Sequence, residues 1–424
     1  MIKTAVLLIL TMIAFVLCMQ AGFVSLLSWM WLSVMMPQSE AWNSAALNYS
    51  NLAAGTLTVI ALITAKDKKI PPLNIFTTLF FIFTAIFILS QIFSLDRELS
   101  AVSFRIGIAT LFMTYAILTL VNTKVRIQAV LWIFVLSTGY YGVTRGLYTI
   151  ATAGAGIVIG PANTIISDNN QLAVGLAMMV PLAYYLFRTS LDKRVKVMAA
   201  GISALSIIAV IGSHSRGGLI SLGVLSAGLI MRSKKKLLNV IILLVVVGAS
   251  IPMMPAEWFE RMETISNAEE DASFMGRVEA WEAAYKLSLK YPILGLGSRL
   301  QYLPEYNSKV GASFKRATHN AYLEILAGHG YLAFGAFLGM MAVTFFWCRK
   351  IRRLTKNRSG FLWANDLAGM LQLSLMVYGV GVMALSMEFW IGLWLNMVLV
   401  FNLREIVLRD VKMPPVATAQ KVYA

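Results

Sequence analysis

Long apolar runs alternate with short polar segments along almost the whole chain. A helix of about 20 apolar residues crosses the hydrocarbon core of a bilayer, and most of these runs reach or approach that length. The runs lie at residues 3–19, 21–36, 48–65, 74–93, 101–122, 127–143, 171–188, 196–213, 217–232, 237–254, 320–348, 362–386 and 388–404. The pattern predicts an all-α polytopic membrane protein with about 12–13 transmembrane helices. If there are 12 transmembrane helices, one of the two short N-terminal runs is re-entrant or interfacial.

One long polar segment, residues 255–320, interrupts this pattern. Apolar residues recur in it at helical spacing, namely Phe274, Val278, Trp281, Tyr285 and Leu289. Pro292 ends this amphipathic helix, which we expect to lie against the membrane surface or to roof the helical bundle. Arg277 falls beside the apolar stripe and can point toward the spans. The chain then divides into a transmembrane bundle (1–254), a polar loop with the functional residues (255–319), and C-terminal transmembrane helices with a tail (320–424).

Composition and charge support a membrane protein with a defined orientation. The chain is 58% hydrophobic and 13% charged, its mean hydropathy is +0.72, and its net charge is +16. Most basic residues lie in short loops at 66–69, 124–126, 188–196, 232–236 and 349–358 and in the tail at 404–421. This asymmetry follows the positive-inside rule, so these loops are predicted to be cytoplasmic and nucleic acid is not an expected partner. The alternating loops at 37–48, 94–100, 144–170, 213–218 and 255–320 then face the periplasm.

The first candidate for chemistry is the polar segment Ser213–Gly218 between two apolar runs. Arg216 at a membrane face is costly unless it has an anionic partner. Its planar guanidinium can bind phosphate through two charge-assisted hydrogen bonds, and the following glycines let a bulky group approach. The alternative is an interfacial arginine that extends to lipid phosphates. Ser215 and His214 are further candidates beside it.

His319 is the second candidate, because it precedes an apolar run and follows the basic pair Lys315 and Arg316. An imidazole with a pKa near 6.5 suits proton removal from a hydroxyl at neutral pH. A structural or interfacial histidine is the alternative, and the neighbouring Asn320 could take part in either role. His329, inside the same apolar run, is expected to be a packing residue.

A third cluster, Asp168, Asn169 and Asn170, precedes another apolar run. Such side chains cap helices, and they also bind sugar hydroxyls, so both interpretations stay open. Four further charged residues lie in or at the ends of spans: Arg105, Glu324, Asp366 and Glu388. They could form a transport pathway, but their scatter favours separate local partners.

Taken together, these motifs resemble the O-antigen ligase and polymerase superfamily of bacterial inner-membrane glycosyltransferases. The elements that carry the resemblance are Ser215-Arg216-Gly217, Gly276-Arg277 with Trp281, the Pro292–Gly297 turn, and His319-Asn320 with Tyr322, Leu323 and Gly330. The segment from Pro255 to Arg277, the Asp168–Asn170 cluster and the run Trp29–Ser33 ahead of Pro37 are similar to putative O-glycosylation ligases of exosortase systems.

The resemblance implies a GT-C-like fold with one large periplasmic loop. It also implies transfer of a glycan from undecaprenyl pyrophosphate to an acceptor hydroxyl, most simply O-antigen to lipid A-core, in the bacterial inner membrane. No cofactor or metal is expected, and the displacement inverts the anomeric centre. In this scheme Arg216 and Arg277 bind the donor pyrophosphate and His319 orients or deprotonates the acceptor.

Three other functions remain open from the sequence. A polysaccharide polymerase and a protein O-oligosaccharyltransferase share the donor and differ in the glycan or protein acceptor. A lipid-linked glycan transporter would depend on the charges within the spans rather than on the loop. Cys18 and Cys348 lie in apolar runs, where they form neither a disulfide framework nor a metal site.

Overall fold

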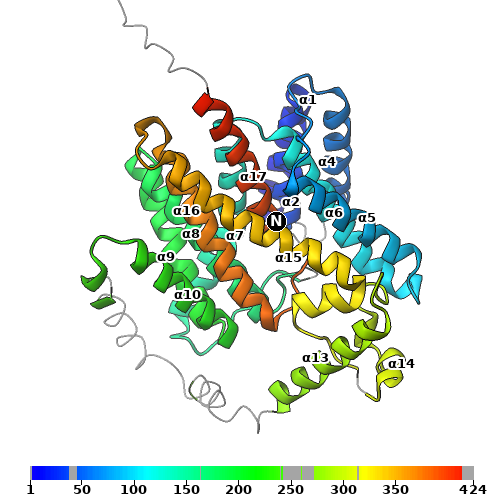
Figure 1. Cartoon of the computed structure of the whole chain (residues 1–424). Coiled ribbons are helices and arrows are strands. Elements are labelled where there is room, and N and C mark those ends of the chain that lie inside the picture. The colour runs from blue at the N-terminus through cyan, green and yellow to red at the C-terminus, as the bar shows by residue number, and fades with distance from the viewer. Residues whose placement is uncertain are drawn as a thin grey trace, which may run out of the picture.

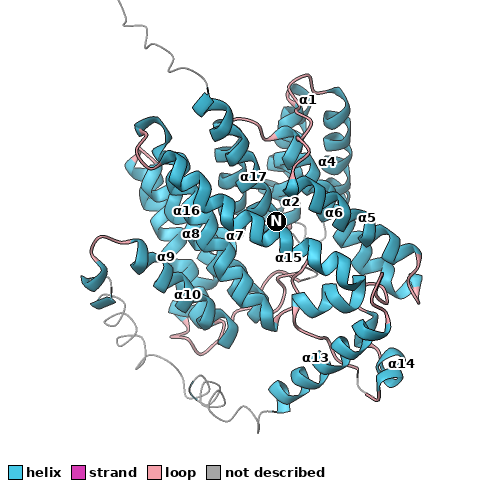
Figure 2. Ribbon diagram, viewed as in Figure 1, coloured by secondary structure: helices cyan, strands magenta, loops and turns pink. Residues whose placement is uncertain are grey.

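The computed structural model describes residues 2–37, 45–162, 164–238, 240–241, 259, 272–312 and 315–412. Every regular element in these ranges is a helix (Figure 2). The α-helices are α1 (Ile2–Gln20), α2 (Gly22–Met35), α4 (Ala45–Thr64), α5 (Ile75–Ile92), α6 (Arg97–Leu120), α7 (Lys124–Ala151), α8 (Asn169–Thr189), α9 (Lys193–Gly212), α10 (Arg216–Arg232), α13 (Ala272–Lys290), α14 (Pro304–Asn307), α15 (Ala321–Thr355), α16 (Leu362–Gly381) and α17 (Ile391–Lys412). Short 3₁₀ turns within the same ranges are η2 (Leu300–Tyr302), η3 (Ser308–Val310), η4 (Ser359–Phe361) and η5 (Val382–Ala384).

The predicted fold class is confirmed, because the described part of the chain is an all-α bundle of apolar helices. Eight of its helices are long and apolar enough to span a membrane, and α1, α2 and α4 contain shorter apolar stretches. Each predicted run coincides with a helix except 237–254, most of which lies outside the described residues. In Figure 1, α13 and α14 lie at one end of the bundle, and the connection between α15 and α16 lies at the opposite end.

Helix α7 is longer than the apolar run predicted, so the expected loop 144–170 is wrong over its first two turns. Two glycines on α7, Gly142 and Gly146, allow it to approach α9. A Cβ atom at Gly146 would overlap the Leu205 carbonyl oxygen, and one at Gly142 would overlap Ser206 Oγ. Close packing against α9 therefore extends the helix through residues whose intrinsic propensity is low.

Helix α15 is broken where the sequence predicted one continuous span. Gly330 has φ 80° and ψ 176°, outside the helical region. The Pro292–Gly297 turn fits against this break: Leu296 N–H donates to Ala327 O at 3.0 Å, and Tyr331 N–H donates to Pro292 O at 2.9 Å. These bonds satisfy backbone groups that the break leaves without helical partners. The turn and the broken span are thus one structural unit, which orients the residues on either side.

Helix α13 forms where the apolar spacing predicted it, but the predicted stripe is not its buried face. Tyr285 is 51% exposed and Leu289 is 56% exposed. The buried face instead consists of small residues and one leucine: Gly276, Ala280, Ala283, Ala284 and Leu287. Small side chains let α13 pack closely on the first part of α15 and around Leu296 and Leu300.

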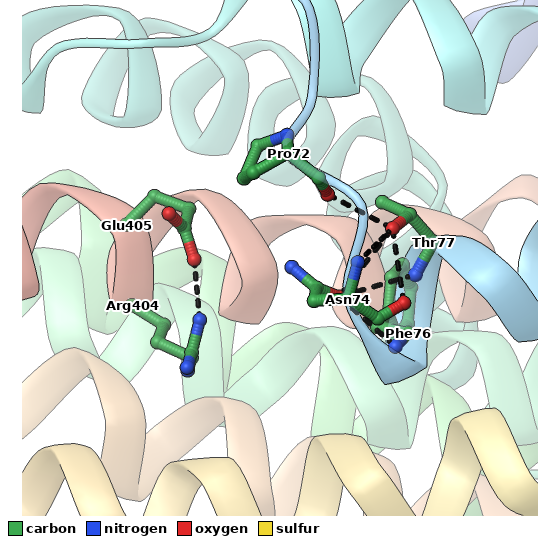
Figure 3. A network of polar contacts seen from close by, with 6 residues as sticks. All are labelled: Pro72, Asn74, Phe76, Thr77, Arg404 and Glu405. Atoms are coloured by element: carbon green, nitrogen blue, oxygen red, sulfur yellow. Dashed lines mark hydrogen bonds and ion pairs between the residues drawn. The ribbon is translucent and has the colours of Figure 1, made fainter.

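At the end of the bundle opposite α13, a capped helix and an aromatic cluster hold α5, α15 and α17 together. Asn74 caps α5, and its side chain and that of Thr77 form a reciprocal capping box (Figure 3). The Phe76 ring then packs against the Trp347 ring of α15, with ring centroids 6.0 Å apart. The Arg404 guanidinium of α17 lies 4.3 Å from the centroid of the same indole and pairs with Glu405 (Figure 3).

Candidate functional site

His319 is held in a strained conformation immediately before α15. Its φ of 47° is unusual for a residue with a side chain. The residues on both sides are fixed by hydrogen bonds, since Trp281 Nε1 of α13 donates to Thr318 O at 2.8 Å and the Asn320 side chain caps the N-terminus of α15. Asn320 therefore has the role of a helix cap. The strain persists because α13 and α15 together constrain the segment.

The surroundings of His319 favour the neutral imidazole. Burial lowers the pKa of His319 below its usual value of 6.5, and the nearby cation Arg277 lowers it further. Asp168 opposes this shift, while Arg299 adds to it. Nδ1 of His319 is buried and accepts no hydrogen bond from the described residues. A neutral imidazole with a free nitrogen can accept a proton at neutral pH, which is the property of a general base.

Arg316 lies against the first turns of α13, the helix that carries Arg277. A Cβ atom at Gly276 would overlap Arg316 Nη1, so the Arg316 guanidinium crosses α13 in the space that this glycine leaves. The Arg316 backbone N–H also donates to Tyr302 O at 3.2 Å. Arg277 is half-buried, whereas Lys315 is exposed. Arg316 thus lies against the turn of α13 that carries Arg277, and its side chain is exposed like that of Lys315.

Hydrogen bonds hold the segment around Arg216, and the two residues before it have structural roles. His214 has φ 53°, and its Nε2 lies 2.9 Å from the Gly154 carbonyl oxygen, to which it donates. Ser215 Oγ accepts from Gly218 N–H at 3.0 Å and so caps α10. Arg216 is the first residue of α10 and is half-buried. His214 and Ser215 therefore fix the position from which Arg216 extends.

The Asp168–Asn170 cluster is a helix cap that also connects two parts of the site. Asp168 Oδ1 accepts from the backbone N–H of Asn170 at 2.8 Å and from its side-chain amide at 2.9 Å. Asn169 Nδ2 donates to Ser213 O at 2.8 Å, which joins the start of α8 to the segment before α10. Asp168 also acts electrostatically on His319. The structure therefore brings Asp168 near His319 and Asn169 to the Arg216 segment, while a joint clamp by Arg216 and Arg277 remains a prediction.

Sequence reasoning missed a buried charged cluster around Arg299. Glu324 of α15 is 3% exposed and Glu388 is 5% exposed. The two carboxyl groups interact with each other and with Arg299, so the expectation that each has a separate local partner is wrong for this pair. It holds for Asp366, whose carboxylate lies 3.6 Å from the Arg188 guanidinium. Arg299 itself has φ 63° and follows the Gly-rich turn that fits against α15.

Two hydroxyl groups, those of Tyr302 and Ser386, extend this cluster. Nearby charges shift the pKa values of Tyr302 and Arg299. Tyr302 Oη donates to Ser386 Oγ at 3.2 Å, and Ser386 Oγ donates to Glu324. Burial together with Glu324 and Glu388 raises the pKa of the Tyr302 hydroxyl well above its usual value. Burial disfavours the Arg299 cation, but Glu388, Tyr302 and Glu324 outweigh burial and raise the pKa of Arg299. These shifts favour the charged form of Arg299 and the protonated hydroxyl of Tyr302.

Arg299 also lines a cavity of about 510 Å³ within the described bundle. The walls combine two indoles, side-chain amides and hydroxyls with aliphatic residues of α6. The residues that define its character are Trp29, Ser33, Asn51, Thr110, Gln171, Ser386 and Trp390. Gln171 Nε2 donates to Ser386 O at 3.3 Å, which ties the start of α8 to the loop after α16. Aromatic rings with polar groups of this kind suit a ligand that is neither wholly apolar nor strongly charged.

The fold and the site define a polytopic helical membrane protein with a histidine and arginine site at one end of its bundle. Residues 201–338 match the family described as O-antigen ligase, and residues 1–192 match a family of unknown function, DUF5935. No curated protein matches the chain. The first match confirms the resemblance to the O-antigen ligase superfamily and covers Arg216, Arg277 and His319. It supports a ligase or polymerase type of function on lipid-linked glycans.

Proposed function

We propose that the protein transfers a glycan from undecaprenyl pyrophosphate to an acceptor hydroxyl at the periplasmic face of the bacterial inner membrane. The acceptor proposed is lipid A-core, as in an O-antigen ligase. The observation that carries the proposal is the environment of His319, whose pKa is lowered by burial and by Arg277. This histidine lies within the region that matches the O-antigen ligase family.

The chemistry is a single displacement at the anomeric carbon. The acceptor oxygen forms the new glycosidic bond as the bond between the anomeric carbon and the phosphate oxygen breaks. His319 accepts the hydroxyl proton, and undecaprenyl pyrophosphate leaves with the electron pair. Arg216 and Arg277 bind the pyrophosphate and stabilise the negative charge that develops on it. Inversion of the anomeric centre follows from one displacement.

Donor binding would also make His319 easier to protonate. In the free protein, Arg277 and Arg299 disfavour a second positive charge at His319. A pyrophosphate bound to Arg277 would offset that repulsion, so the imidazole could hold the proton that it receives. Three helices, α8, α10 and α15, begin in the segments that carry the site, and helix N-termini favour a bound anion.

The cavity beside Arg299 is a candidate binding site for a sugar of the donor or acceptor. Its volume of about 510 Å³ falls in the range of small-ligand sites. Indole faces such as those of Trp29 and Trp390 can stack on sugar rings, and the Asn51 and Gln171 amides can bind hydroxyls.

The proposal is tested with the purified protein in liposomes that contain a lipid-linked glycan, with lipid A-core, a second lipid-linked glycan or a protein as the acceptor. Glycan on lipid A-core supports the ligase. Elongated lipid-linked glycan identifies a polymerase, and glycan on protein identifies an O-oligosaccharyltransferase. Movement of the donor across the membrane without a new bond would overturn the transferase in favour of a transporter.

Two histidine variants sharpen the test. His319→Ala should reduce turnover by about 100-fold to 10,000-fold with donor affinity nearly unchanged, because a general base contributes on that order and the arginines bind the donor. His329→Ala is the matched control. His329 is buried, and its Nδ1 lies 2.6 Å from Ser90 Oγ, so its loss should reduce stability and leave turnover per folded molecule near wild type. Normal turnover in His319→Ala would show that His319 is not the general base.

A further inference from the structure

A second cavity, of about 370 Å³, lies where α15 ends and α16 begins, at the end of the bundle opposite α13 (Figure 1). It is lined by Arg349, Arg352, Arg353, Lys356 and Asn365. Helical spacing places the four cations on one face of the last turns of α15 and the residue after it. Among the described residues, no carboxylate lines the cavity.

The walls of this cavity are held by specific contacts. Asn365 Nδ2 of α16 donates to Arg352 O at 2.9 Å and contacts Thr355 Oγ1 at 3.0 Å, which binds the start of α16 to the end of α15. The Arg352 side chain lies over α16, and its Nε would be 3.6 Å from a Cβ atom at Gly369. The four cations therefore border a defined hollow.

The charge of the cavity favours an anionic ligand. Four cations on about two helical turns repel one another, and the C-terminus of α15 offers only about half a negative charge in compensation. The neighbouring acid Asp366 is paired with Arg188. Arg232 of α10 adds another cation near Arg352, and its Nη2 donates to Gln372 Oε1 at 3.2 Å. A bound anion would relieve this repulsion.

The surface beside the cavity is apolar. Phe346, which lies on α15 in the turn before Arg349, is 59% exposed, and Leu362 at the start of α16 is 56% exposed. A soluble anion would use only the cations. A phospholipid would place its phosphates among the cations and its acyl chains on this apolar surface.

We propose that this cavity binds the headgroup of an anionic phospholipid, and that four cations are best matched by a headgroup with two phosphates. The binding site is separate from the glycan-transfer site and does not depend on the function proposed for it. Lipid bound there would join α15 to α16 at the end of the bundle that carries the basic loops.

The test measures lipid binding to the purified, delipidated full-length protein by native mass spectrometry. The probes are cardiolipin, phosphatidylglycerol, phosphatidylcholine and inorganic pyrophosphate. The test variant is Arg349→Gln with Arg353→Gln, and both residues are exposed, so neither substitution leaves a buried gap. The matched control is Lys193→Gln with Arg194→Gln, two exposed basic residues at the start of α9 outside the cavity.

Wild type and control should bind cardiolipin more tightly than phosphatidylglycerol, and both more tightly than phosphatidylcholine. The test variant should lose about 25-fold in cardiolipin affinity, because it lacks two basic residues and each one near a lipid phosphate contributes about 5-fold. Unchanged cardiolipin affinity in the test variant would overturn the proposal. So would phosphatidylcholine binding as tight as that of cardiolipin, or pyrophosphate binding as tight, since these outcomes indicate apolar contact alone or a soluble-anion site.

Discussion

Replacing Arg299 with Met removes the cation that faces the two buried carboxyl groups of Glu324 and Glu388. Both glutamates are at most 5% exposed, so their carboxyl groups are shielded from bulk solvent. Arg299 acts on these carboxyl groups electrostatically, and removing it should cost up to about 3–5 kcal/mol, the value for a buried ion pair in direct contact, because the remaining charge stays buried with less compensation. Methionine has similar length and no charge, so little of this loss should come from packing.

A second variant separates the electrostatic cause from lost packing. Arg299→Met combined with Glu388→Gln leaves no uncompensated charge at Glu388, and it should recover at least half of the lost free energy of unfolding. Arg97→Met is the control, since Arg97 is exposed at the start of α6 and should change the free energy by less than about 0.5 kcal/mol.

The measurement is equilibrium unfolding by sodium dodecyl sulfate in mixed micelles, followed by tryptophan fluorescence and circular dichroism. An Arg299→Met protein that unfolds within about 0.5 kcal/mol of wild type would refute the reasoning. A double variant no more stable than the single variant would also refute it, because the loss would then come from something other than the stranded carboxyl group.

Three further predictions concern the proposed site. The ratio kcat/KM should rise with pH and level off, with a midpoint below 6.5, because this ratio reports the free protein, in which the pKa of His319 is lowered and the neutral form is the base; a midpoint above 6.5 in a pH series of kcat/KM contradicts this. Arg216→Lys and Arg277→Lys should each lose most transfer in liposomes, since an ammonium cannot form the bidentate phosphate contact; near-normal activity of both removes the clamp. A cysteine at exposed Lys309 should react with a membrane-impermeant thiol reagent from the periplasmic side and one at exposed Lys235 should not, and the reverse pattern inverts the orientation.

The placement of the helices could be predicted because apolar length is a property of the local sequence, whereas only eight of the predicted 12–13 spans are long and apolar enough to cross a membrane in the described residues. The errors arose where packing between distant segments decides the structure. Gly146 continues α7 because α9 approaches it, and Gly330 breaks α15 because the Pro292–Gly297 turn satisfies the freed backbone groups. In α13, alanines form the buried face, because close approach to α15 matters more there than the area of the large apolar side chains.

The site was predictable where a residue type limits the chemistry. Arg216, Arg277 and His319 were predicted because a guanidinium and an imidazole are costly near a membrane without a role, and their roles stay predictions. Arg299 was missed because its partners Glu324 and Glu388 are distant along the chain, and neither acid carries a local signal of pairing. The Gly-rich turn before Arg299, followed by two carboxyl groups at the ends of spans, is the pattern that could have revealed it.

The two ends of the bundle use cations in different ways. Arg277 and Arg299 act on His319 against Asp168, and Glu324 and Glu388 in turn act on Arg299, so the local field depends on the balance of opposite charges. Such a balance can hold an imidazole neutral and still respond to a bound pyrophosphate. At the end of α15, cations line a cavity to which the described residues contribute no carboxylate. That arrangement retains an anion but provides no base, so we expect catalysis at the first end and lipid binding at the second.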